Sequence, residues 1–330
     1  MNVLITGGAG FIGVNLVRRL LAEGTPPGRI RLLDDLSVGS LAALDASGVQ
    51  VAVEVDWSEE RPAIAHWPVD IARTPDLAAA MAGAGVIIHL AGASGVQASV
   101  DDPRSDAEQN VLGTLNCITA ARDVGASRFV FASSHATLAG ASPPFREDMA
   151  ASPMSPYGVS KLAGEGYCAA FFQSYGLEAV ALRFSNAYGP FSAHKSSVVS
   201  SFIRRALESG EAVVYGDGTQ TRDLIFVDDV ARAIRGSALS ADCGGEIFHI
   251  ATGVEVSVNE LIDILLAAFE RRGLPPFSVR HAPARPGEAT RSFSDIAKAH
   301  RILGWKPEIS LHDGVERTLD WFLGESRGGA

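Results

Sequence analysis

VLITGGAGFIG, residues 3–13, places a short apolar run directly before the glycines Gly7, Gly10 and Gly13. The run Val3–Thr6 predicts a buried strand, and Phe11–Glu23, with its apolar residues on one face, predicts a helix. Glycines at such a turn let the backbone approach a pyrophosphate, which then lies at the positive end of the helix. The stretch therefore predicts the opening strand, turn and helix of a dinucleotide-binding sheet.

The same alternation of short apolar runs and longer amphipathic segments continues to about residue 180. Strands that alternate with helices form parallel sheets, with helices on both faces. We therefore expect an α/β fold built on a doubly wound parallel Rossmann sheet. The further strands expected in it are Ile30–Asp34, Gly85–Leu90, Arg128–Ser133 and Glu178–Arg183.

After Asn186 the pattern changes, which predicts a smaller, interleaved α/β lobe that binds substrate. A helix is expected from Val198 to about Ser209, and a capping box at residues 257–260 begins another. The segment Asp223–Gly236 predicts a strand and helix that return to the main sheet. The expected division is residues 1–184 plus about 222–250 for the dinucleotide domain, and about 185–221 and 251–330 for the other lobe.

Composition limits the classes of function. The chain has 330 residues, 47% of them hydrophobic, and a net charge of −10. A broad nucleic-acid or anionic-membrane surface needs a basic face, so neither partner is expected. Three cysteines without a CxxC pair predict no structural metal, no disulfide framework and a reducing compartment. A strand at the first residues and no run long enough to span a membrane predict a cytoplasmic protein.

An acidic residue at the end of the second strand specifies the cofactor. Asp34 lies 21 residues after Gly13, where a carboxylate binds the adenosine ribose hydroxyls. The neighbours Asp35 and Ser37 supply no arginine for a 2′-phosphate, so NAD is expected rather than NADP. The alternative is a glycine turn that only packs helix against strand.

Tyr157 and Lys161 form the candidate redox pair. Ser155 and Pro156 predict a helix start, which places the two side chains one turn apart on one face. A nearby ammonium lowers the pKa of a phenol, so Tyr157 could take a proton from a sugar hydroxyl. Alone, this spacing is also common in solvated helical pairs.

Together these motifs resemble the extended short-chain dehydrogenase/reductases, specifically the NAD-dependent nucleotide-sugar epimerases and dehydratases, from Val3 to about Trp321. The resemblance implies a homodimer and a nucleotide-sugar substrate. His89, in the matching strand, is expected to be a packed core histidine. The cofactor contacts that the resemblance implies are Gly7, Gly10, Phe11, Ile12, Gly13, Asp34, Asp35, Ser37, Gly39, Asp70, Ile71, Leu90, Ala91, Gly92, Asn110, Ser133, Tyr157, Lys161 and Phe184.

The second lobe is similar to the same family. Asn186 matches an asparagine that contacts the sugar-nucleotide phosphates, and Arg222 and Arg285 match a diphosphate clamp; surface solubility is the alternative for the arginines. The substrate contacts implied are Ser94, Ser134, Asn186, Val199, Arg222, Arg285, Glu288 and Ser292.

His135 stands where the family carries a Ser or Thr that joins the substrate oxygen to the tyrosine. The imidazole could replace that hydroxyl as a donor or proton shuttle, which makes Tyr157, Lys161 and His135 the expected catalytic set. The alternatives are that Ser134 takes this place, or that His135 is purely structural.

The residues after His135 indicate the reaction type. Family dehydratases and decarboxylases carry carboxylates there, whereas this chain has Ala136 and Thr137, as hexose 4-epimerases do. A nucleotide-sugar 4-epimerase acting through transient C4 oxidation is therefore expected. A dehydratase, decarboxylase or reductase, or a cofactor-binding regulator, remains the alternative. Ser292 at a family gate position would admit an N-acetylated sugar, and Lys195 could meet a uronate carboxylate or belong to a solvated loop.

Overall fold

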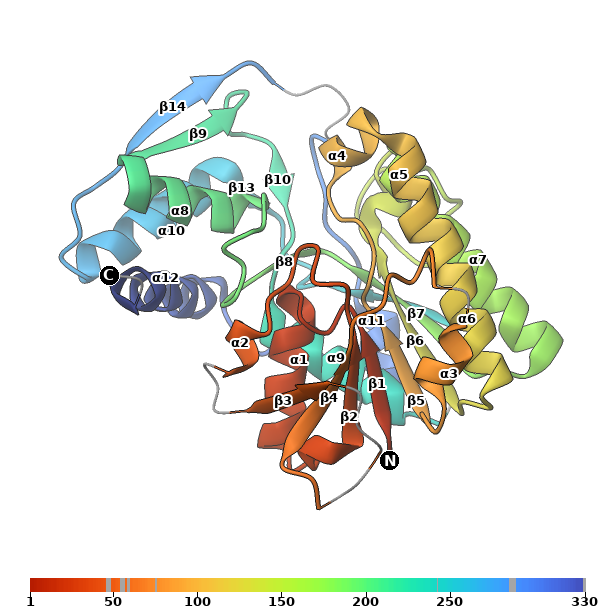
Figure 1. Ribbon diagram of the computed structural model, residues 1–330. Coiled ribbons are helices and arrows are strands. Elements are labelled where there is room, and N and C mark those ends of the chain that lie inside the picture. Colours follow the sequence, from red (N-terminus) through yellow and green to blue (C-terminus); the bar gives the residue numbers. More distant parts are fainter. Residues whose placement is uncertain are drawn as a thin grey trace.

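The computed structural model describes residues 1–45, 49–53, 57, 60–74, 76–241, 243–284 and 289–328. Eight strands, all parallel, form the main sheet in the order β12-β7-β6-β5-β1-β2-β4-β3 (Figure 1). The α/β doubly wound architecture predicted from the glycine turn is confirmed. The strands are β1 Val3–Thr6, β2 Ile30–Leu33, β3 Gln50–Val53, β4 Ala63–Trp67, β5 Val86–His89, β6 Arg128–Ser134, β7 Ala179–Phe184 and β12 Ile247–Ile250.

Helices cover both faces of this sheet because alternate strand residues point to opposite sides. Val3 and Ile5 of β1 pack in one apolar cluster, whereas Leu4 between them packs in the other. The first cluster is covered by α1 (Phe11–Ala22), α9 (Val227–Leu239) and α11 (Ala297–Leu303). The second lies under α3 (Leu77–Met81), α6 (Gly113–Asp123) and α7 (Pro156–Tyr175), on the opposite side in Figure 1.

The second lobe lies beside the carboxyl ends of the main strands (Figure 1). It is built on two parallel strands and three helices around a separate apolar core that includes Phe202, Leu265 and Leu319. The capping box expected at its second helix is confirmed, with Ser257 and Glu260 each bonded to the other's backbone amide. These main elements are β9 Glu211–Tyr215, β14 Ser278–Ala282, α8 Val198–Ser209, α10 Val258–Arg271 and α12 Leu311–Gly328.

Two details of strand assignment differ from the prediction. The strand expected after Asp223 to return to the main sheet is β11 (Leu224–Phe226), which pairs instead with β8 (Asn186–Tyr188); β12 is the strand that joins the main sheet. The strands β3 and β4 were not predicted. The strand β3 is a short apolar run at the partly exposed sheet edge, and His66 interrupts the apolar residues of β4, so neither gives a strong strand pattern.

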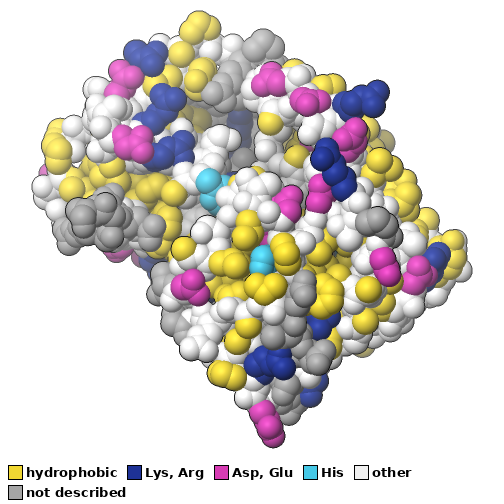
Figure 2. All heavy atoms as spheres, in the orientation of Figure 1, with side chains coloured by type: hydrophobic (Ala, Val, Ile, Leu, Met, Phe, Trp, Pro, Cys, Tyr) yellow, Lys and Arg dark blue, Asp and Glu magenta, His cyan; other side chains and the backbone are white. Residues whose placement is uncertain are grey.

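The remaining elements are short. They are α2 Ala42–Asp45, α4 Val96–Asp101, α5 Pro103–Ala107, the 3-10 turns Pro27–Arg29 and His135–Leu138, the π-helical turn Glu108–Leu112, and the strand pair β10 Thr221–Arg222 with β13 Val256–Ser257. None of the described helices is both long and apolar enough to cross a membrane. On the face drawn in Figure 2, basic side chains lie among acidic and apolar ones, without a continuous basic surface among the coloured residues.

Candidate active site

The glycine turn between β1 and α1 fits a pyrophosphate. Gly7 has φ +68°, and a Cβ there would lie 2.6 Å from the backbone N of Ala91, so only glycine suits the position. A Cβ on Gly13 would lie 2.5 Å from the Gly7 carbonyl oxygen. Gly10 caps α1 without a side-chain acceptor, which leaves the first amides of the helix directed at the space above the turn.

Asp34 lies at the end of β2 beside this turn and is buried. Its Oδ2 accepts from the Ala9 amide at 2.9 Å, and its Oδ1 accepts from the Leu36 amide at 2.9 Å. These bonds fix the carboxylate against the glycine loop, and each oxygen keeps a lone pair for a ribose hydroxyl. The exposed Asp35 accepts from the amide and hydroxyl of Ser37, so it braces the loop after β2.

Other residues expected near the cofactor line the same edge of the sheet. A Cβ on Gly39 would collide with the Ala9 carbonyl, which holds the loop after β2 against the glycine turn. Leu90 and Ala91 follow β5 and bond to Thr6. Asp70 accepts from the Ala72 amide at 2.9 Å, Ile71 is buried beside it, and Phe184 is buried at the end of β7.

His89 is the packed core histidine that the sequence predicts. It is fully buried, with Nδ1 2.7 Å from the Thr6 hydroxyl and Nε2 3.0 Å from the Thr114 hydroxyl. Burial and the charge of Lys161 lower the pKa of His89 to about 3, so the ring is neutral.

The helix α7 carries the candidate catalytic pair. Ser155 accepts from the Gly158 amide at 3.2 Å and Pro156 occupies the first turn, as predicted. Tyr157 and Lys161 lie one turn apart, with the Lys161 Nζ 5.7 Å from the phenol ring centroid. The ammonium donates to the Ala132 carbonyl at 3.0 Å. Burial lowers the pKa of Lys161 to about 8, against the opposing influence of Asp106.

The pKa of Tyr157 differs from the expectation. Burial raises it to about 12, whereas the sequence predicted that Lys161 would lower it. Asp106 also raises the pKa, and the group that lowers it is the Ser134 hydroxyl, which is hydrogen-bonded to Tyr157. In this arrangement desolvation of the phenolate is the largest influence on the pKa of Tyr157.

Ser134, rather than His135, therefore supplies the hydroxyl beside the tyrosine. The Ser134 Oγ also accepts from the Ala136 amide at 3.1 Å, which fixes its direction. The His135 ring lies edge-on to Phe145, with ring centroids 6.0 Å apart. Burial and the charge of Arg222 lower the pKa of His135 to about 4. Its Nδ1 is buried without a hydrogen-bond partner among the described residues, so the neutral ring is available to an incoming polar group.

A buried aspartate behind the pair was not predicted. Asp106 Oδ1 accepts from the Asn110 side-chain Nδ2 at 2.8 Å, and its Oδ2 accepts from the Ser160 hydroxyl at 2.6 Å. Asn110 lies in the π-helical turn and also donates to the Ala93 carbonyl at 3.1 Å. Its Oδ1 is buried without a partner among the described residues and faces Gly92. The site thus offers a preset acceptor close to Lys161.

Glu165 is a second site residue that the sequence analysis missed. It binds Arg183 through two bonds of 2.8 Å, and the Ser133 hydroxyl donates to it at 2.5 Å. Its spacing from Lys161 and Tyr157 along α7 was the available signal, because residues four apart share a face. The pair ties α7 to β6 and β7 immediately behind the catalytic residues.

Two of the residues expected to hold the substrate, Asn186 and Arg222, lie on the short strands β8 and β10. Asn186 donates to the Asp223 carbonyl at 3.3 Å, and Arg222 donates to the Ala289 carbonyl at 2.9 Å. Ser292 is buried, whereas Val199 packs inside the second lobe's apolar core. Of the other residues expected to bind substrate, Arg285 and Glu288 lie outside the described residues.

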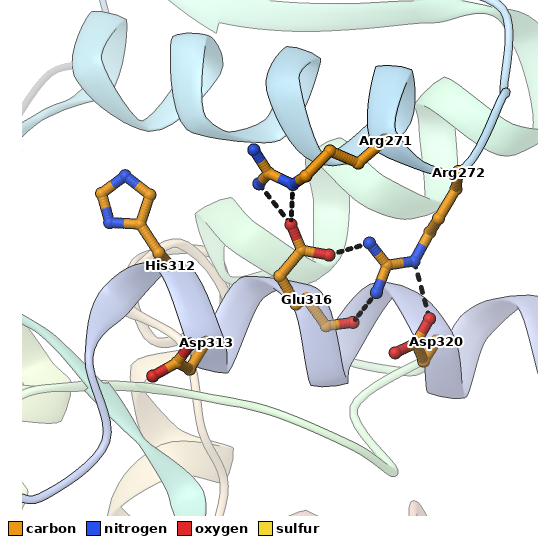
Figure 3. A pocket seen from close by; sticks show the side chains of 6 residues that line it. All are labelled: Arg271, Arg272, His312, Asp313, Glu316 and Asp320. Carbon is orange, nitrogen blue, oxygen red and sulfur yellow. Dashed lines mark hydrogen bonds and ion pairs between the residues drawn. The ribbon is translucent and has the colours of Figure 1, made fainter.

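A hollow between α10 and α12 lies apart from this site (Figure 3). Arg271 donates to Glu316 at 2.7 Å, and Arg272 bonds both Glu316 and Asp320. These ion pairs neutralise one another and hold the two helices together, so the hollow does not present a charged binding site.

Together, the fold and site define an NAD-binding protein of the short-chain dehydrogenase type. The family model described as the NAD dependent epimerase/dehydratase family matches residues 3–251. The UDP-glucose 4-epimerase of Mycolicibacterium smegmatis is 37% identical, with 99% of this chain and 100% of the relative covered. A dTDP-glucose 4,6-dehydratase of Streptomyces antibioticus is 32% identical, with 98% and 92% covered.

Solved structures agree with these relatives. The UDP-glucose 4-epimerase of Thermotoga maritima, crystallised with UDP-glucose, superposes with a TM-score of 0.86 at 32% identity and covers 99% of this chain and 100% of that one. The chain belongs to the NAD-dependent epimerase/dehydratase family.

Proposed function

We propose that the protein is a nucleotide-sugar 4-epimerase that acts on a UDP-sugar by transient oxidation at C4. The observation that carries the proposal is the combination of Tyr157, Lys161 and Ser134 with a following turn that contains no acid. Ala136 and Thr137 are buried there, and the Thr137 hydroxyl is bonded to the Ser134 carbonyl. Elimination of water or loss of a carboxyl group needs an additional acid or base, whereas epimerisation needs one base used twice.

The residues divide the chemistry as follows. Tyr157 accepts the proton of the C4 hydroxyl and later returns it to the same C4 oxygen, after the keto-sugar has rotated to present its opposite face. The Ser134 hydroxyl, bonded to Tyr157, stabilises the phenolate, and the Lys161 ammonium adds a favourable charge. NAD, when bound at the glycine turn, would supply the hydride acceptor and donor for this chemistry. Arg222 binds the diphosphate and leaves the sugar free to rotate.

The test is direct. Purified protein is incubated separately with UDP-glucose, UDP-N-acetylglucosamine and UDP-glucuronate without added NAD, and the products are followed by NMR. A reversible mixture of C4 epimers from at least one substrate supports the proposal. Loss of water or carbon dioxide would contradict it.

A dehydratase is the second candidate, because the Streptomyces antibioticus relative carries that name at 32% identity. The same NMR experiment distinguishes it through the appearance of a 4-keto-6-deoxy sugar. A regulator that retains NAD without chemistry predicts no turnover with any nucleotide sugar.

Ser292 bears on the size of the sugar, because its match to a family gate position implies room for a substituent larger than hydroxyl. Ser292 is small, buried, and close in the chain to Phe293, whose carbonyl accepts from the Phe145 amide at 2.9 Å beside His135. We infer that an N-acetylated or otherwise substituted hexose is accepted. Comparison of kcat/KM for UDP-glucose and UDP-N-acetylglucosamine tests this, and a strong preference for the unsubstituted sugar would contradict it.

A homodimer through α6 and α7 is part of the proposal. Val159 and Tyr175 on α7 and Leu112 just before α6 are each more than half exposed, so large apolar side chains lie on the surface of both segments. Light scattering is expected to give the mass of two chains, and Val159→Glu is expected to give one. A monomeric wild type would contradict this part.

A further inference from the structure

Lys195 reaches from the second lobe to the cofactor edge of the main sheet. It lies in the loop between β8 and α8, and its Nζ donates to the Ser94 hydroxyl at 3.4 Å. The same Nζ lies 6.0 Å from the centroid of the Phe11 ring. Ser94 follows β5 and Phe11 begins α1, so the ammonium spans the two elements that border the glycine turn.

The loop that carries Lys195 is held in place from α8. The Lys195 amide donates to the Ser192 carbonyl at 2.9 Å, and the Ser200 hydroxyl donates to the Ser192 hydroxyl at 2.8 Å. Arg204 donates to the Lys195 carbonyl at 3.2 Å. Ser192 and Ser200 are fully buried. The position of the lysine backbone is therefore set by packed structure.

The ammonium has no acidic partner among the described residues, and it donates a hydrogen bond to the Ser94 hydroxyl. Its charged neighbour is Lys161, which carries the same sign. Burial lowers the pKa of Lys195, so the group is partly desolvated without a compensating carboxylate. The partly buried Lys195 ammonium lies beside the amino end of α1, and the buried Lys161 ammonium is its charged neighbour. This arrangement creates a positive field suited to a bound anion.

We propose that Lys195 binds the pyrophosphate of NAD from the second lobe, opposite the α1 amides, and thereby retains the cofactor. The alternative anion, a uronate carboxylate on the sugar, would lie near Tyr157 and Ser134. Phe11 and Ser94, the contacts of Lys195, instead flank the glycine turn. Retention also suits a reaction that returns its cofactor unchanged.

The test measures cofactor binding rather than turnover. Wild type, Lys195→Met, Lys195→Arg and the exposed-surface control Lys306→Met are stripped of NAD. Binding of NAD, ADP-ribose, adenosine and UDP-glucuronate to each is then measured by calorimetry. If Lys195 makes a charge-assisted hydrogen bond to the pyrophosphate, Lys195→Met is expected to lower the affinity for NAD and for ADP-ribose by about tenfold or more. The affinity for adenosine, which has no phosphate, is expected to stay unchanged. Lys195→Arg is expected to restore most of the affinity, and Lys306→Met to match wild type.

Three outcomes would overturn the proposal. The affinity of Lys195→Met for ADP-ribose could be unchanged, its affinity for adenosine could fall as much as that for ADP-ribose, or only its affinity for UDP-glucuronate could fall. The last result would assign Lys195 to a sugar carboxylate. Thermal melting of each variant separates lost binding from lost folding. If Lys195→Met melts early, Lys195→Gln provides the same comparison. None of these readouts depends on epimerase activity, so the proposed reaction and this proposal fail separately.

Discussion

Replacing Asp106 with Asn removes a buried charge while preserving the side chain's size and one acceptor oxygen. Asp106 raises the pKa of both Lys161 and Tyr157. Lys161 has a pKa of about 8. Loss of a nearby opposite charge lowers the pKa of an ammonium by about one unit or more, which corresponds to ~1.4 kcal/mol. The protonated share of Lys161 at pH 8 is therefore expected to fall from about half to about a tenth.

The consequence is a shift of the pH profile. Activity that needs charged Lys161 is lost as pH rises through its pKa, so a lowered pKa moves this loss to lower pH. Activity that needs ionised Tyr157 appears as pH rises, and a lowered phenol pKa moves this gain to lower pH as well. We therefore expect the whole kcat/KM profile of Asp106→Asn to move down by about one pH unit.

The assay is initial-rate epimerisation from pH 5.5 to 10 with the protein's NAD bound. Asp123→Asn is the matched control, because this carboxylate on α6 is partly exposed and pairs with Arg122. Its profile is expected to coincide with that of wild type. A lower rate for Asp106→Asn with an unshifted profile would refute the electrostatic argument and leave Asp106 only a packing role.

Further substitutions test the other parts of the site. Tyr157→Phe is expected to reduce kcat by at least ~100-fold while NAD stays bound, and near-normal turnover would exclude this base. Ser134→Ala is expected to cost more in kcat than His135→Ala, since Ser134 bonds the tyrosine; the reverse order would make His135 the relevant donor. Ser292→Tyr is expected to lower kcat/KM for an N-acetylated sugar by ~10-fold or more and spare plain hexoses, and equal losses would remove its gating role. Glu165→Gln is expected to lower the free energy of unfolding by about 3–5 kcal/mol in denaturant titrations, because it leaves Arg183 buried and unpaired; a loss below ~1 kcal/mol would contradict this.

The sequence predicted what depends on local spacing. The glycines after β1, the acid after β2 and the tyrosine and lysine on one helical face follow from the geometry of a turn or a helix. The strand order could not be read in the same way. β11 pairs with β8 rather than with the main sheet, and only the structure shows which neighbour a three-residue apolar strand finds.

The buried network behind the catalytic pair could not be predicted for a different reason. Asp106 and Ser160 meet only when α5 packs against α7, and Glu165 meets Arg183 only when α7 lies on β7. Such long-range contacts also decide pKa values. The prediction that Lys161 lowers the pKa of Tyr157 considered helix spacing alone. Burial of the phenol determines the direction of the shift, which is upward.

In the proposed reaction the sugar is oxidised and reduced again at C4 within one site. The most direct measurement uses a UDP-hexose labelled with deuterium at C4, incubated with the NAD-containing protein and followed by NMR and mass spectrometry. We expect both C4 epimers to form with the deuterium retained at C4. Exchange of the label with solvent, or conversion to a product that has lost water, would contradict the account.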